Sequence, residues 1–203
     1  LAQAKAGTER PAGEVERVVS KTEHTPYEIH EAMPANVDEL MARVSEQNAA
    51  IVEEYESLLQ KDPLNAQAPQ WLGQIAEFHW QMAHYDYLRA RRSWMTKIEA
   101  CDPDVGNCPP EPRADYHQAI ADYRRILLQY PTYEHTDNVL FRLGDALIRN
   151  QQAKEGIGYL HRLTQTYPDY AEIDAAYLAM GEFYFSQKNT GTAQAAYAKI
   201  VDT

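Results

Sequence analysis

The feature that most constrains this sequence is an internal repeat in its carboxyl-terminal half. When the segment that begins at Tyr116 is shifted by 37 residues, its apolar and small residues fall on residues of the same size class. The matched sets are Ala119, Gly156 and Ala193; Tyr123, Leu160 and Tyr197; Ile126, Leu163 and Ile200; Tyr130-Pro131 and Tyr167-Pro168; Leu140 and Tyr177; Leu143-Gly144 and Met180-Gly181; and Leu147 and Tyr184. A fixed period of this length is typical of a solenoid of stacked units.

The spacing inside one unit predicts two helices that pack against each other. Residues three or four apart share a helix face, and each half of the unit carries one such apolar stripe. The stripes are Leu140, Leu143 and Leu147, followed by Gly156, Leu160 and Leu163. A glycine inside a helix costs about 1 kcal/mol relative to alanine, so Gly144 and Gly156 indicate a close approach of two backbones. Pro168 is expected to end the second helix.

This pattern of residues resembles the tetratricopeptide repeat, which has a Leu-Gly pair, small residues and a closing proline at these spacings. The resemblance implies an all-α fold, a tetratricopeptide-type α-solenoid of antiparallel helix pairs that binds other proteins. The unit exceeds the usual length of about 34 residues between its proline and the next helix. In this respect it is similar to the repeats of bacterial envelope proteins, namely outer-membrane assembly lipoproteins and periplasmic proteins that coordinate cell-wall or gliding-motility machinery.

The amino-terminal half carries a weaker copy of the pattern. Ile51, Tyr55 and Leu58 repeat the spacing found in the second helix of a unit. Leu72-Gly73 follows at the distance expected for the first helix of the next unit. We expect one helix from Asn36, with Asn36 as its cap and Glu39 as the capping-box partner, to about Gln60. A second, very long helix is predicted from about Pro69 to Glu99, and it is too long to be covered by a repeat partner.

These patterns divide the chain into an arm and an array. Residues 1–35 hold few large apolar side chains, so we expect a flexible or extended amino-terminal arm. Residues 36–203 form the predicted helical array, irregular over 36–114 and regular over 115–203. The last residues stop within the second helix of a unit, so we expect either that the array continues beyond residue 203 or that this end docks on another chain.

Two cysteines, Cys101 and Cys108, lie in an irregular loop inserted between the helices of one unit. The leading interpretation is a disulfide that shapes the loop, which would persist in an oxidising compartment such as the periplasm. Zinc is disfavoured because no further ligands stand at finger spacing, and calcium is disfavoured because the loop lacks the closing glutamate. We therefore predict a periplasmic protein whose signal peptide has been removed, with outer-membrane association left open.

Composition and motifs exclude several functions. The formal charge of −11 disfavours nucleic acid and anionic lipid as general partners, and no apolar run is long enough to span a membrane. His79 and His84 lie five residues apart, hence on different helix faces, and no nucleophile elbow, phosphate loop or zinc-protease motif is present. We therefore predict no enzyme activity, no metal and no cofactor.

Two surfaces are candidates for binding a partner. The first is the concave groove of the array, lined by residues left over from the packing stripes of the first helices. These are Asn138, Phe141, Arg142, Asp145 and Arg149, and in the next unit Leu178, Glu182 and Phe185. Alternatively, Phe141 and Phe185 pack between adjacent units. The second is a basic and aromatic patch on the long helix, formed by Arg89, Arg91, Arg92, Trp94 and their neighbours Tyr87 and Lys97. This patch is either a solvated face or a docking site for an acidic partner.

Together these observations predict a non-catalytic scaffold or adaptor that holds protein partners of a complex in the bacterial cell envelope, as part of assembly or motility machinery. Two alternatives stay open: a regulatory or targeting subunit of an envelope enzyme complex for cell-wall metabolism, and a cytosolic chaperone adaptor.

Overall fold

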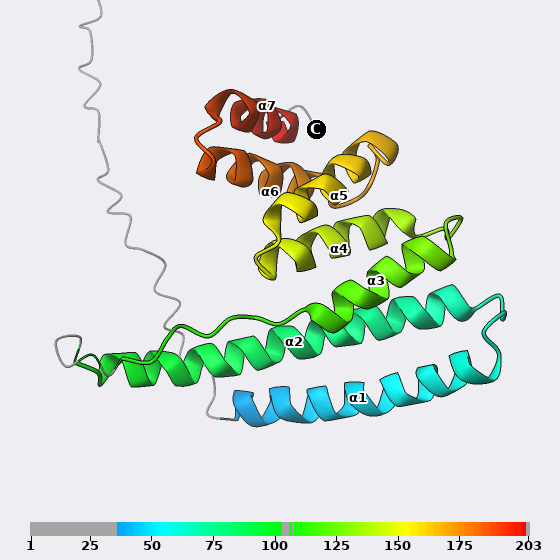
Figure 1. Ribbon diagram of the computed structural model, residues 1–203, viewed down its shortest axis with the longest axis horizontal. Helices are drawn as coiled ribbons and strands as arrows, with labels where there is room; N and C mark the ends of the chain where they lie inside the picture. The colour runs from blue at the N-terminus through cyan, green and yellow to red at the C-terminus, as the bar shows by residue number, and fades with distance from the viewer. Residues whose placement is uncertain (1–35, 103–105, 107, 202–203) are drawn as a thin grey trace, which may run out of the picture. The chain divides into compact units, whose positions relative to one another are not determined.

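The structure is a computed structural model that describes residues 36–102, 106 and 108–201. These residues lie in one compact unit, Ala35–Thr203; the predicted arm, residues 1–35, lies outside the described residues. The helices are α1 (Val37–Lys61), α2 (Ala68–Glu99), α3 (His117–Gln129), α4 (Thr136–Arg149), α5 (Ala153–Thr166), α6 (Ile173–Ser186) and α7 (Thr190–Val201). No strand occurs within the described ranges, and successive helices run antiparallel and stack in chain order (Figure 1). The predicted all-α solenoid is confirmed.

The first helix begins and ends where the sequence predicts, but its buried face differs. The side chain of Asn36 makes no capping hydrogen bond, so the predicted capping box does not form. The buried residues of α1 are Asn48, Val52 and Leu59, whereas Ile51 is 37% exposed. The prediction that Ile51 belongs to the packing face of this helix was therefore wrong by one position, because Val52 rather than Ile51 faces α2.

The long helix α2 spans 32 residues, which corresponds to about 48 Å at 1.5 Å per residue. Its buried residues all lie in its first three turns: Ala68, Leu72, Ile75 and Ala76. In Figure 1 α3 covers the amino-terminal half of α2. α1 runs beside α2 as far as the ion pair between Asp38 and Arg92, and the last turns of α2 extend past both helices. The predicted overhang is thus present.

The loop after α2 is closed by a disulfide between Cys101 and Cys108, with an S–S distance of 2.08 Å. A second contact holds the returning chain, because the indole Nε1 of Trp94 donates a hydrogen bond of 2.9 Å to the carbonyl oxygen of Pro109. The linker then runs back along α2 to the start of α3 (Figure 1). This confirms a cysteine-containing loop inserted between the two helices of one unit.

Two clusters of buried residues hold the described helices together. The first joins α1, α2, α3 and α4, with Leu72, Ile75 and Leu147 among its fully buried side chains. The second joins α4, α5, α6 and α7 around Leu140, Leu160 and Leu163. The apolar stripes predicted for α4 and α5 are therefore the residues that form the core.

The α4 and α5 helices cross at Gly144 and Gly156. A Cβ atom added at Gly156 would lie 2.6 Å from the carbonyl oxygen of Gly144 and 2.9 Å from Cγ1 of Ile148. One added at Gly144 would lie 2.6 Å from Cδ2 of Leu160. The close backbone approach predicted from these two glycines is confirmed.

A pair of glycine substitutions on α5 tests this crossing. Gly156→Ala should lower the free energy of unfolding by about 1–2 kcal/mol, since overpacking outweighs the gain in helix propensity. Gly158→Ala is the matched control, because a Cβ there meets nothing within 4 Å. It should raise the stability by up to about 1 kcal/mol. Urea denaturation of both variants measures the difference, and a stabilising Gly156→Ala would contradict the close crossing.

Candidate protein-interaction site

The groove residues predicted on α4 lie on two different flanks of the helix. Arg142 and Arg149 face α2, where their guanidinium carbons lie 5.7 and 5.6 Å from the ring centroid of Trp80. Phe141 lies on the opposite flank, is only 8% exposed, and packs against Tyr170 at a centroid distance of 5.5 Å. Phe141 therefore packs between two units, which is the alternative left open by the sequence, and we do not include it in the candidate site.

Ion pairs fix the two arginines on the flank that faces α2. The Nε of Arg149 donates to both carboxylate oxygens of Asp145, at 2.9 and 2.8 Å. The Nε of Arg142 lies 3.5 Å from Oε2 of Glu77 on α2. The hydroxyl of Tyr123 on α3 donates to the same carboxylate at 3.2 Å. Glu77 thereby ties α2, α3 and α4 together beneath the site.

Aromatic side chains complete the site around Trp80. The imidazole of His84, one turn further along α2, stacks on the indole at a centroid distance of 5.1 Å. The ring of Tyr116, just before α3, lies 5.7 Å from the indole, and its hydroxyl is 3.3 Å from Nδ1 of His84. We call this set the Trp80 cluster: Trp80, His84, Tyr116, Arg142 and Arg149.

Two donors in the Trp80 cluster are buried without a hydrogen-bond acceptor among the described residues. They are Nε1 of Trp80 and Nε of Arg142. The Nε of Arg142 lies close enough to Glu77 for an ion pair but makes no hydrogen bond to it. A buried donor left unsatisfied costs about 1–3 kcal/mol. Both atoms are shielded from solvent, so a partner would meet the exposed parts of the two arginine side chains instead.

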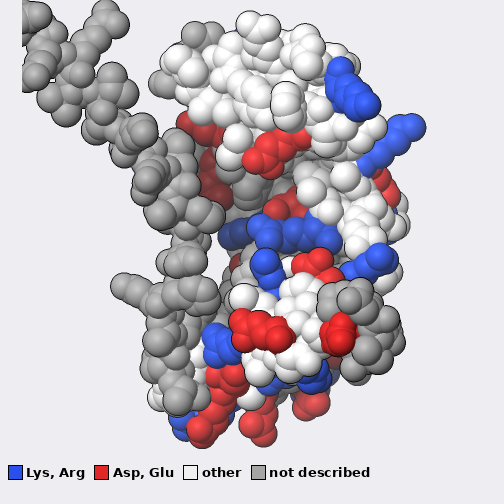
Figure 2. Space-filling view, turned by 90° about the vertical axis from the view of Figure 1, so that its left-hand side faces the viewer, with Lys and Arg blue, Asp and Glu red and all other residues white. Residues whose placement is uncertain are grey.

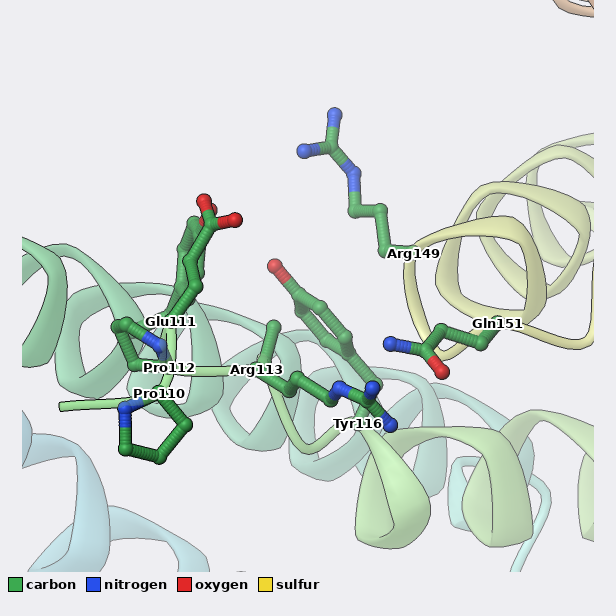
Figure 3. Close-up of a pocket in the computed structure, with 9 residues that line it drawn as sticks. Pro110, Glu111, Pro112, Arg113, Tyr116, Arg149 and Gln151 are labelled. Atoms are coloured by element: carbon green, nitrogen blue, oxygen red, sulfur yellow. The ribbon is translucent and has the colours of Figure 1, made fainter. Parts of the chain in front are cut away.

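A cleft of about 640 Å³ adjoins the cluster at Tyr116 and Arg149. Figure 3 shows the linker residues Pro110 to Arg113 and Tyr116 on one side of this space, and Arg149 and Gln151, at the end of α4, on the other. The proline-rich wall has few backbone donors, because proline lacks an N–H group. Hydrogen bonds to a ligand here would therefore come mainly from side chains.

Burial favours the uncharged form of the two titratable aromatic side chains of the cluster. Burial raises the pKa of the Tyr116 hydroxyl. The pKa of His84 is lowered below its ordinary value of 6.5, mainly by burial and further by the positive charge of Arg149. The charges of the site are therefore carried by the arginines and their carboxylate partners.

Two of the four cations in the predicted basic patch on the end of α2 are paired within the protein. Arg89 forms an ion pair with Asp86 at 2.9 Å, and Arg92 pairs with Asp38 of α1 at 3.0 Å. Trp94 is held by its bond to Pro109, whereas Arg91 is exposed. Figure 2 shows basic and acidic side chains interleaved on the visible face of the molecule. Of the two interpretations of this patch, these contacts favour the solvated face.

The remaining predicted residues lie apart from the Trp80 cluster. Asn138 is exposed on α4, and Leu178, Glu182 and Phe185 are all exposed on α6. Sequence reasoning missed Trp80, His84 and Tyr116. A usable signal was present on α2, because Trp80, His84, Tyr87 and Arg91 follow one another at spacings of three or four and so share a face. Tyr116 had no such signal, since an irregular linker places it.

Within the described part of the chain, no group of His, Cys, Asp or Glu is arranged to hold a metal ion. None of the described helices has the length and apolar character needed to cross a bilayer.

Residues 138–170 match the family model described as "Tetratricopeptide repeat". The solved structure titled "Crystal structure of MamA" is similar to the chain, with 14% sequence identity and a TM-score of 0.40, and covers 79% of this chain and 90% of that one. No curated protein sequence matches the chain. The chain thus contains a tetratricopeptide repeat within an all-α, tetratricopeptide-type solenoid. A fold of this class indicates a protein-interaction scaffold, which is typically non-catalytic.

The lowered pKa of His84 predicts a pH dependence of stability. The unfolded chain binds a proton at this residue more readily than the folded protein, so stability should fall as the pH decreases through 6.5 toward the folded-state pKa. Titration of the His84 imidazole by NMR should give a pKa below 6.5. Arg149→Gln should raise that pKa, because it removes a nearby positive charge. A pKa at or above 6.5 in the unmodified protein would contradict the burial of this ring.

Proposed function

We propose that this protein is a non-catalytic adaptor of the bacterial cell envelope that binds a segment of a partner protein on the surface formed by α2, α4 and the linker before α3. The observation that carries the proposal is the Trp80 cluster, where an indole lies beneath two guanidinium groups beside a cleft. Tryptophan and arginine are enriched among the residues that dominate binding energy in protein interfaces.

The electrostatics of the surface support a polypeptide with oxygen acceptors. Arg142 is 28% exposed and Arg149 is 45% exposed at their side chains, so both can contact a partner while their carboxylate partners hold them in place. Pre-oriented side chains lose little entropy on binding.

A charge reversal at the edge of the cluster tests the proposed surface. Arg149→Glu should weaken binding of the physiological partner at least about tenfold, since it removes a charge-assisted contact and repels an acceptor oxygen. Arg162→Glu is the matched control, because Arg162 is exposed on α5 and has the same change of charge. The partner is first captured by a photoreactive residue placed at Gln151, and its affinity for each variant is then measured by calorimetry. Equal affinities for the two variants would refute the surface.

The envelope assignment is supported by the disulfide, because such bonds persist in oxidising compartments and are rare in the cytosol. We expect Cys101 and Cys108 to be oxidised in cells. Rapid alkylation in intact cells, followed by non-reducing mass spectrometry of the peptide, measures their state. Two alkylated, free thiols would refute the envelope assignment and favour the cytosolic adaptor.

A further inference from the structure

The apolar residues that the sequence singled out on α1 are left open in the structure. Shifts of 68 and 105 residues relate Ile51, Tyr55 and Leu58 to positions that are buried in α3 and α5: Ala119, Tyr123, Ile126, Gly156, Leu160 and Leu163. In those units the preceding helix, α2 or α4, covers the positions. In α1, Ile51 is 37% exposed and the other two are only partly buried. In Figure 1 α1 lies at the edge of the stack, with α2 on one side and no described helix on the other.

Two rows of side chains run next to each other along α1. The first faces α2 and contains the buried residues Asn48, Val52 and Leu59. The second begins one residue earlier, which is about 100° around the helix. We call it the open row, because Leu40 is 52% exposed and none of its members is buried. Its residues follow spacings of three, four and seven: Val37, Leu40, Val44, Ile51 and Leu58. Such spacing is typical of a helix that packs lengthwise against another helix.

A row of exposed residues flanks the open row on the side away from α2. We call it the charged row, and its spacings alternate between four and seven: Glu39, Arg43, Ala50, Glu54 and Lys61. The order along the helix is negative, positive, neutral, negative, positive. When the row is reversed, every charge meets one of opposite sign, with Ala50 at the centre. The charged row is therefore complementary to a reversed copy of itself.

An antiparallel pair of α1 helices from two copies of the chain would match both rows. With the two Ala50 residues close to a two-fold axis, Arg43 comes level with Glu54 of the second copy to within about 3 Å along the helix. The same axis places Glu39 level with Lys61 of the second copy. In the open rows, Leu40 meets Leu58 of the second copy. Opposite charges beside an apolar seam select the partner and the direction of paired helices.

An ordinary first helix of a repeat would fit the open row poorly. In the regular units the position of closest approach holds a small residue, which is Ala119, Gly156 or Ala193. A Cβ atom at Gly156 would already lie 2.6 Å from the carbonyl oxygen of Gly144. α1 has Ile51 at this position, and its larger side chain keeps a neighbouring helix further away. Distances between helix axes range from about 8 to 10 Å with the size of the side chains in contact, so α1 suits a partner at the wider end.

We propose that two copies of this chain form a symmetric dimer in which their α1 helices pair antiparallel through the open row, flanked by the charged row. The two-fold axis makes every contact occur twice. The pairing uses a side of α1 that does not face α2, so it stands independently of the Trp80 cluster. The dimer would carry two such clusters, which would strengthen the binding of a partner that has more than one recognised segment.

Sedimentation equilibrium of the whole chain tests the dimer, at about 0.15 M salt where long-range repulsion between acidic chains is largely screened. Arg43→Glu and Glu54→Arg should each weaken the dimer at least about tenfold, because each brings like charges together twice. The double variant Arg43→Glu, Glu54→Arg should return to within about threefold of the unmodified chain. Glu53→Arg is the matched control, because Glu53 is exposed but lies outside both rows, and it should leave the dimer unchanged.

A chemical cross-link locates the pairing on α1. A short bismaleimide should join Ala50→Cys to its counterpart in the second copy. It should not join Ala49→Cys, an exposed neighbour about 100° around the helix. Cys101 and Cys108 form a disulfide and do not compete for the reagent. Circular dichroism should show unchanged helix content in all variants, because the substituted residues are exposed.

Three results would overturn the dimer. The first is a whole chain that stays monomeric, whether its open row is free or covered by another segment. The second is a double charge variant that associates no better than either single variant, since the charged rows would then not face each other. The third is equal cross-linking at Ala49→Cys and Ala50→Cys.

Discussion

The rest of the described fold depends on the way α4 is buried on both flanks. Val139, Leu143 and Leu147 contribute to the core shared with α1, α2 and α3. Leu140 and Phe141 contribute to the core shared with α5, α6 and α7. Because residues three or four apart face the same way, one helix can carry two apolar stripes and still leave a polar strip between them. That strip supplies Arg142, Asp145 and Arg149 to the candidate site.

The regular part of the fold could be predicted because each unit repeats its packing residues at a fixed period. Gly144 and Gly156 indicated a close crossing, and the positions of their missing Cβ atoms show that a side chain at either residue would crowd the facing helix. The buried face of α1 could not be read in the same way. Ile51 and Val52 are adjacent apolar residues, and only the partner helix decides which of them is turned inward.

The site was only partly predictable, for a related reason. The periodicity of α4 identified Arg142, Asp145 and Arg149 as residues outside the packing stripes. It did not separate them from Phe141, because the direction in which the next unit packs is a tertiary property. The Trp80 cluster draws its other members from α2 and from the linker, whose path is set by the disulfide and by the bond from Trp94 to Pro109. No local pattern encodes that path.

The division of the core into two clusters has a consequence for how the protein opens. The clusters meet chiefly at α4, and Leu127 and Tyr159 are among the few partly buried side chains that touch both. Solenoids transmit stability mainly between neighbours. The α6–α7 pair can therefore separate from the array in a subglobal opening that leaves α1 to α4 folded. In such an opening the amides of α6 and α7 would exchange with solvent sooner than those of α2 and α3.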